Sequence, residues 1–263
     1  MSIASFQQAL CDLIASPQLC LALRAKPEAA LAGYQLSARE RKRLLEVVWQ
    51  RGMSTNCTLY RSNRVTPIYT LLTFTCRALG DQLRTLLDEF WDAGEFQDGQ
   101  FHSEVERFAA FLSRCIAAGG IQSPFAAELL QFELAVNAVE FAPRRQILKE
   151  IAKLPALQPD TPCRLHPLAR VVRFRHDPDV LLEAAARGAL PSDMPERDAL
   201  VVVSVISDSA PTIVRFSDDA CDALFDAAGI VEPLIPRRMP ALAAAGLLVA
   251  SDVAVRVSAY PSL

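Results

Sequence analysis

The chain has 263 residues, 51% hydrophobic and 22% charged, which is enough to bury the cores of two ordinary domains without disulfides. A formal net charge of −3 and a pI near 5.7 exclude the basic footprint of a general nucleic-acid binder. The seven cysteines include no C-x-x-C pair, which is typical of reduced thiols in the cytosol. No secretory leader or apolar run of roughly 20 residues is visible, so we expect a cytoplasmic protein that binds no membrane and no nucleic acid.

Residues 1–155 have apolar side chains at helical spacing, interrupted by Pro, Gly and Ser residues that end one helix or begin the next. Ser37 and Glu40 have the spacing of a capping box, in which each side chain accepts a backbone N–H at the start of a helix. Ser103 and Glu106 have the same spacing. The sequence therefore predicts an all-α helical domain over this range.

Residues 56–67 contain the densest group of hydrogen-bond donors in the chain. On a helix, four of them share one face: Asn56, Tyr60, Asn63 and Arg64. Such a face is either solvated and hydrogen-bonded within the protein, or an interface that holds the carboxylates and carbonyls of a partner. With Arg61, these residues are candidates for partner binding. Thr66 and Pro67 predict the start of a new helix, because a first-turn proline loses no intrahelical hydrogen bond.

Residues 155–167 contain four prolines and predict a domain boundary. After them, residues 170–175 alternate like a half-buried strand, and residues 200–206 are apolar enough for a central strand. A turn then leads into residues 212–216, which are expected to form a hairpin with the preceding strand. A short helix is predicted from Pro178 to Ala186.

The end of the chain predicts two further helices and a strand: a helix capped by Ser217 and running to Ala228, a helix over residues 240–245, and a strand over residues 253–257. Residues 161–263 are therefore expected to form a small winged-helix-like α+β domain. The hairpin strand at 212–216 is the one expected to keep a free edge. The candidate peptide-binding residues are Thr212, Ile213, Val214, Arg215, Phe216 and Leu224.

Residues 59–64, 71–80 and 86–91, with a second match at 124–135, resemble the helical domain of the partner proteins of multinuclear non-heme iron peptide oxidases. Those partners accompany enzymes that modify cysteines of ribosomally made peptides, as in the methanobactin, bufferin and thiaglutamate pathways. The resemblance implies a non-catalytic subunit of a heterodimer whose iron is held by the oxidase, with no cofactor in this chain. The helical domain over residues 1–155 would dock on the oxidase.

The predicted order of elements in residues 161–263 resembles the leader-recognition domains of peptide-modifying systems. In those domains, the leader of a precursor peptide adds as a strand to an open sheet edge. The resemblance implies that this domain binds the precursor peptide leader, and the complete second domain favours the thiaglutamate type of partner.

Two alternatives from other classes remain. The helix pair after the hairpin could serve as a helix-turn-helix of a DNA-binding transcriptional regulator, although its candidate recognition segment, residues 236–240, contains just two basic residues. Cys57 or Cys221 could serve a cysteine-dependent enzyme. No catalytic motif is visible, and the three histidines do not have the spacing of a helical metal site, so neither a catalytic residue nor a bound metal is expected.

Overall fold

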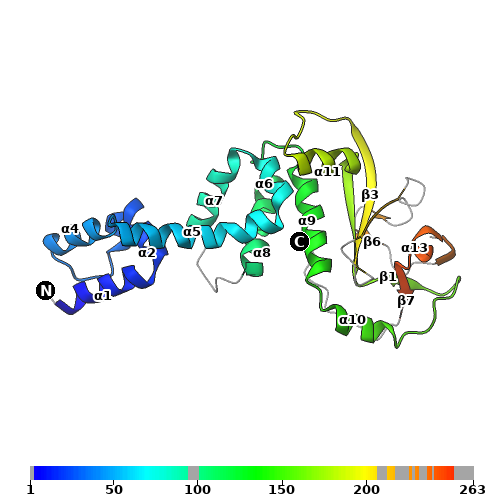
Figure 1. Ribbon diagram of the computed structural model, residues 1–263, viewed down its shortest axis with the longest axis horizontal. Coiled ribbons are helices and arrows are strands. Elements are labelled where there is room, and N and C mark those ends of the chain that lie inside the picture. Colours follow the sequence, from blue (N-terminus) through cyan, green and yellow to red (C-terminus); the bar gives the residue numbers. More distant parts are fainter. Residues whose placement is uncertain are drawn as a thin grey trace. The chain divides into compact units, whose positions relative to one another are not determined.

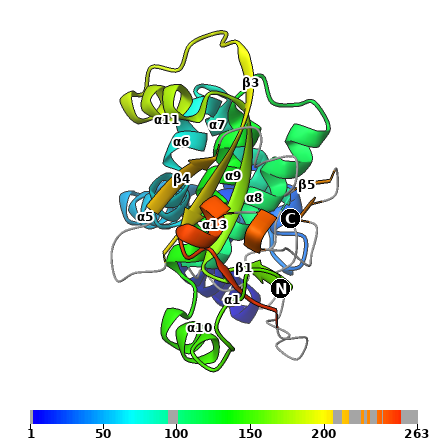
Figure 2. The same ribbon diagram turned by 90° about the vertical axis from the view of Figure 1, so that its right-hand side faces the viewer.

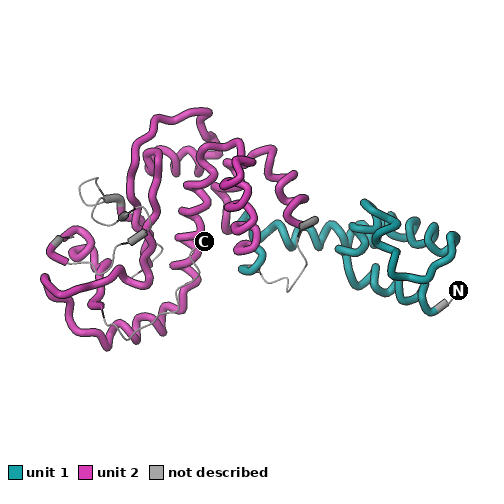
Figure 3. Tube along the Cα trace, turned by 180° about the vertical axis from the view of Figure 1, so that it is seen from behind, with its two compact units in different colours: residues 1–70, 98–104 teal, residues 71–97, 105–263 magenta. Residues whose placement is uncertain are grey.

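The computed structural model describes residues 3–93, 101–205, 212–216, 225–226, 229–230, 236–238 and 240–251. Helices come first and antiparallel strands follow, so the predicted mixed α+β class is confirmed (Figure 1). The chain forms two compact units, residues 1–70 with 98–104 and residues 71–97 with 105–263 (Figure 3). The proline-rich segment near residue 155 lies inside the second unit, and the division into domains 1–155 and 161–263 stays a prediction.

The described part of the first unit consists of four helices of 4 to 13 residues and the longer α5, around one apolar core. Its helices are α1 (Ile3–Ala15), α2 (Pro17–Ala25), α3 (Pro27–Ala30), α4 (Ala38–Val47) and all but the last residue of α5 (Arg51–Leu71). Ser16 caps α2 by accepting the N–H of Leu19. The capping box predicted at Ser37 and Glu40 is confirmed at the start of α4. The core includes Leu13, Leu23, Leu44, Val48 and Cys57.

Helix α5 continues through Pro67, so the predicted start of a new helix at Thr66 is wrong. An internal proline removes one backbone hydrogen bond and usually breaks or kinks a helix. Here Pro67 and Ile68 are both buried, and this burial offsets the cost. The hydroxyls of Thr66 and Thr70 also donate to the carbonyls of Ser62 and Thr66, which gives these backbone acceptors a second partner beside the proline.

The helices of the second unit pack around α9 (Ala126–Glu140), which is buried along most of its length. The others are α6 (Thr73–Leu79), α7 (Gln82–Ala93), most of α8 (Phe101–Ala117), α10 (Arg144–Ile151) and α11 (Pro178–Arg187). Helix α6 contacts α9 on one side, and the sheet contacts it on another (Figure 1). Because α8 begins at Phe101, Ser103 lies within the helix, and the capping box predicted there is wrong.

Two buried polar residues of α9 form hydrogen bonds with the backbone where α5 ends and α6 begins. The Glu133 carboxylate accepts the N–H groups of Phe74 and Thr75 over 2.7 and 2.8 Å, and the Thr75 hydroxyl over 2.7 Å. Asn137 donates its amide N–H to the carbonyl of Leu71 over 3.1 Å. Burial raises the pKa of Glu133 above its ordinary value, although the three hydrogen bonds act in the opposite direction. Helix α9 therefore supplies the polar groups that the ends of α5 and α6 would otherwise lack.

The main sheet has three antiparallel strands in the order β2 (Ala169–His176), β3 (Glu196–Ser204) and β4 (Thr212–Phe216) (Figure 2). The predicted hairpin and the central place of the apolar strand are confirmed. One core joins α9 to one face of the sheet through Leu129, Phe132, Val172, Phe174, Val201 and Val203. A second core joins the other face to α13 (Pro240–Ala244) through Val202, Val214 and Leu242.

The remaining described elements are short. Strand β1 (Cys163–Leu165) pairs with β7 (Leu248–Ala250), β5 (Phe225–Asp226) pairs with β6 (Gly229–Ile230), and η1 (Pro236–Arg238) is a 3-10 turn. The helix predicted from Ser217 to Ala228 is wrong at Phe225 and Asp226, which form a strand. Helix α13 confirms the prediction for residues 240–245. The strand predicted over 253–257 lies outside the described residues, and the winged-helix arrangement stays a prediction.

Candidate functional site

Strand β4 lies at one side of the sheet, and no other described strand pairs with its outer edge. An unpaired edge presents a row of backbone N–H and C=O groups that another chain can bind. Five pairs of residues join β4 to β3 in continuous register, from Leu200 opposite Phe216 to Ser204 opposite Thr212. The strand is therefore held firmly on one side and is a candidate site for an added strand on the other.

The direction of each backbone group in this sheet follows from one hydrogen bond. In an antiparallel pair, opposite residues alternate between exchanging two hydrogen bonds and exchanging none. The N–H of Val205 donates to the carbonyl of Leu168 over 3.1 Å, and these residues are opposite one another when the register of β2 and β3 is continued by one pair. Odd-numbered residues of β3 therefore direct their backbone groups toward β2, and even-numbered residues direct theirs toward β4.

Val214 lies opposite Val202, so its N–H and C=O groups bond to β3. The backbone groups of its neighbours, Ile213 and Arg215, consequently point to the outer edge. In β2, the N–H of Arg175 donates to a carboxylate outside the sheet, as this alternation requires. The register of β2 and β3 shifts between Phe174 and His176, and the N–H of His176 donates to the same carboxylate because of this irregularity.

The side chains of β4 differ in their surroundings. Val214 is half-buried and packs in the core around Leu242. Ile213 lies on the opposite face, across from the fully buried Val203, yet 49% of its surface is exposed. Thr212 is exposed. The side chains of Arg215 and Phe216, and the whole of Leu224, lie outside the described residues. An exposed apolar side chain thus lies beside backbone groups that no described strand pairs with.

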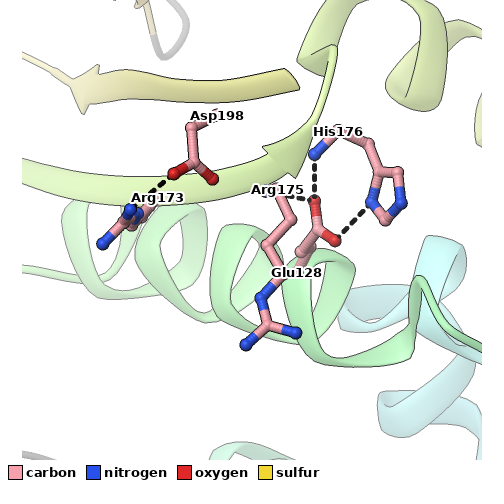
Figure 4. Close-up of polar contacts among 5 residues, drawn as sticks. All are labelled: Glu128, Arg173, Arg175, His176 and Asp198. Carbon is pink, nitrogen blue, oxygen red and sulfur yellow. Dashed lines mark hydrogen bonds and ion pairs between the residues drawn. The ribbon is translucent and has the colours of Figure 1, made fainter. Parts of the chain in front are cut away.

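The outer edge of β2 is occupied at its end by a carboxylate from α9 (Figure 4). Glu128 is buried and accepts the backbone N–H groups of Arg175 and His176 over 2.9 and 3.2 Å. Its other oxygen lies 2.7 Å from Nδ1 of His176, and the ring of Phe125 packs edge-on against the imidazole at 5.0 Å. Glu128 therefore fills the position that an added strand would need at this end of β2. Sequence reasoning missed this role, because nothing near Glu128 in the chain signals a strand partner.

The candidate partner-binding residues on α5 do not share one exposed face. Arg61 and Asn63 are exposed, Asn56 is half-buried and lies 3.4 Å from the Ile14 carbonyl, and Tyr60 is half-buried. Arg64 is only 6% exposed, so the expectation of surface exposure is wrong for it. The reason is the 100° step per residue of a helix, which turns Arg64 toward the buried side that also carries Cys57 and Ile68.

Arg64 forms a buried ion pair with Glu104 of α8. Its Nε lies 2.7 Å from the Glu104 carboxylate, which is 2% exposed. The guanidinium also donates to the Tyr60 hydroxyl over 3.3 Å. Arg64 and Tyr60 thus interact within the first unit, whereas Arg61 and Asn63 remain accessible to a partner. The partner-binding role of the five residues stays a prediction.

The candidate reactive cysteine, Cys57, is buried in the core of the first unit. Its Sγ lies 3.8 Å from the Pro17 carbonyl. Burial and the neighbouring Cys57 thiol raise the pKa of Cys20 to about 12. A buried thiol in such surroundings is not exposed to a substrate. Cys221 lies outside the described residues.

No described group of three or more His, Cys, Asp or Glu side chains is placed to hold a metal ion. Across the described ranges, no helix combines the length and the apolar character needed to cross a membrane.

No protein-family model matches the chain, and no curated protein matches its sequence.

Proposed function

We propose that this chain is a non-catalytic partner subunit that presents the leader of a ribosomally made precursor peptide to a multinuclear non-heme iron oxidase. The leader adds as a strand to the outer edge of β4. The observation that carries this proposal is the pair of outward-directed backbone groups at Ile213 and Arg215, beside the exposed Ile213 side chain. Backbone pairing supplies affinity, and side chains at alternate positions supply selectivity.

Glu128 is the reason why we expect the leader to add to the edge of β4 and not to the edge of β2. A strand approaching β2 would have to displace a buried carboxylate from the N–H groups of Arg175 and His176. Displacement leaves that carboxylate without its hydrogen bonds, which is costly for a buried charge. No described side chain of this kind accepts the outward N–H groups of β4.

In the proposed complex, the iron belongs to the oxidase, and this chain contributes no cofactor. Arg61 and Asn63, which are exposed on α5, remain the accessible part of the predicted docking group. Binding both the oxidase and the leader raises the effective concentration of the peptide cysteine at the metals, without chemistry from this chain. The winged-helix-like arrangement of residues 161–263 belongs to the same proposal.

The alternative, a DNA-binding regulator, has less support. One of the two cations in its candidate recognition segment, Arg237, forms an ion pair with Asp160 at 2.9 Å. Residues 236–238 of this segment form the 3-10 turn η1, which is short for a recognition helix that enters the major groove.

Replacing Ile213 by proline tests the proposed edge. The substitution removes an N–H that points outward and leaves the hydrogen bonds to β3 in place. We expect the affinity for the leader to fall by one backbone hydrogen bond, about 0.5 to 1.5 kcal/mol or roughly 2- to 12-fold, plus any effect of the altered side chain. Titration of the full chain into a fluorescently labelled leader measures the change.

Two matched variants accompany this test. Ile213→Ala removes the side chain but keeps the N–H, so it separates the two contributions. Val214→Pro removes an N–H that bonds to β3 and should lower the melting temperature more than Ile213→Pro does. If Ile213→Pro binds the leader as tightly as Ile213→Ala, the leader does not pair with this edge.

The protein purified alone is expected to contain no stoichiometric iron, copper or zinc, because the proposal assigns the metals to the oxidase. Elemental analysis after desalting decides this. A reproducible metal content near one ion per chain would contradict a non-catalytic role.

A further inference from the structure

Charge is distributed unevenly along the chain. Residues 1–70 contain nine Lys and Arg against four Asp and Glu, whereas residues 71–263 contain 18 against 26. Residues 98–104, which complete the first unit, add Asp98 and Glu104, so this unit has nine basic against six acidic residues in a protein that is acidic as a whole. The net charge of the entire chain does not reveal this difference in charge between residues 1–70 and residues 71–263.

Most of the few carboxylates in residues 1–70 already have partners there. Asp12 accepts the Tyr34 hydroxyl over 2.8 Å, Glu40 belongs to the capping box, and Glu28 lies 3.8 Å from Arg41. In contrast, six exposed cations form no ion pair within the described residues: Lys26, Arg39, Lys42, Arg43, Arg51 and Arg61. Their charge is available to a binding partner.

Three of these cations lie on the exposed side of α4. Arg39, Lys42 and Arg43 are spaced by three and four residues, so they share one face of the helix, while Leu44 on the other side is buried. The turn that follows α4 carries Trp49. Continued helical spacing puts Trp49 on the same side as Lys42.

Trp49 is unusually exposed for a tryptophan, a residue that is mostly buried on average. Its exposed fraction is 65%. The Arg24 guanidinium lies 4.7 Å from the centre of its ring, and Arg24 is itself fixed by hydrogen bonds to the Val48 carbonyl and the Ser54 hydroxyl. The indole is thus supported on one face by an anchored cation. Trp and Arg are the side chains most enriched at the energetic centres of protein interfaces.

We propose that the exposed side of α4, comprising Arg39, Lys42, Arg43 and Trp49 and here termed the α4 face, binds an acidic protein segment that carries an apolar side chain. Carboxylates of the segment pair with the three cations, and the apolar side chain packs on the indole. This site is separate from the β4 edge and does not depend on the function proposed for that edge.

A protein segment fits the α4 face better than a nucleic acid does. Glu46 lies on the same side of α4 and is exposed, so it would repel a continuous row of phosphates. A short peptide can instead place single carboxylates beside single cations.

The test uses the full chain and a fluorescently labelled 20-residue peptide that carries single glutamates three and four residues apart, one leucine after them, and uncharged residues at all other positions. Its anisotropy is followed at low salt for wild type, for Arg39→Glu/Lys42→Glu/Arg43→Glu, and for Trp49→Ala. We expect the triple variant to bind about tenfold or more weakly, because three attractions become repulsions. Trp49→Ala should also weaken peptide binding. Added salt should weaken peptide binding by the wild type more than binding by the triple variant.

A matched control reverses three exposed cations of the second unit, Arg84, Arg145 and Lys149, which changes the total charge equally. Each variant's melting curve verifies that it is folded. Equal loss of binding in the control, or no binding by wild type, overturns the proposal. So does tighter, equally charge-dependent binding of a 20-nucleotide oligothymidine, which would identify a nucleic-acid site. Self-association in sedimentation that the triple variant abolishes would instead identify a second copy as the occupant.

Discussion

Replacing Arg64 by alanine is expected to lower the free energy of unfolding of the first unit by about 3 to 5 kcal/mol. The change leaves the Glu104 carboxylate, 2% exposed, without the guanidinium that now lies 2.7 Å away. Removing one partner of a buried ion pair costs far more than removing one partner of a surface ion pair. Urea denaturation of wild type and variant, followed by circular dichroism, measures the difference.

Arg61→Ala is the matched control for this prediction, since Arg61 is one turn earlier on the same helix and exposed. An exposed charge of this kind contributes about 0 to 1 kcal/mol. Glu104→Ala and the double variant complete a cycle that isolates the interaction between the two side chains. If Arg64→Ala and Arg61→Ala have the same stability, the ion pair with Glu104 contributes nothing to the fold.

Glu128→Ala is expected to destabilise the second unit by a similar amount, about 3 to 5 kcal/mol. The substitution removes the acceptor of two backbone N–H groups, at Arg175 and His176, together with the contact to the His176 ring. It also leaves a cavity beside the buried His176 ring. Thermal and urea denaturation both report the loss.

Glu140→Ala, at the exposed end of the same helix, is the control for helix propensity and net charge. Glu128→Gln keeps the shape but turns an amide N–H toward a backbone donor, so its stability should lie between the alanine variant and wild type. Equal stability of Glu128→Ala and Glu140→Ala would show that the hydrogen bonds to β2 are dispensable.

Local signals in the sequence were sufficient for much of the fold. The alternation of residues 170–175 and the apolar run at 200–206 predicted the two longest strands, because strand periodicity depends on near neighbours. The capping box at Ser37 was predictable for the same reason. The place of residues 212–216 at one side of the described sheet followed from chain order, but the identity of the outward backbone groups required the register.

The roles of Glu128, Glu133 and Arg64 could not be read from the sequence. Charged residues on a helix normally face solvent, and the partners of these three lie 40 to 59 positions away in the chain. Helix α9 is also buried on most sides, so it lacks the one-sided apolar pattern that marks a surface helix. The prediction of a helix start at Pro67 is wrong because the preference of proline for the first turn of a helix is outweighed by tertiary burial.

The core shared by α9 and the sheet has a consequence for how the chain folds during synthesis. Leu129 and Phe132 leave the ribosome well before Val201 and Val203, the residues that cover them. The side of α9 that packs on the sheet therefore stays exposed to solvent until β3 has been synthesised. A ribosome paused after α9 has left the exit tunnel and before β3 has done so would hold an aggregation-prone intermediate, and chaperone contact with the nascent chain should be strongest over that interval.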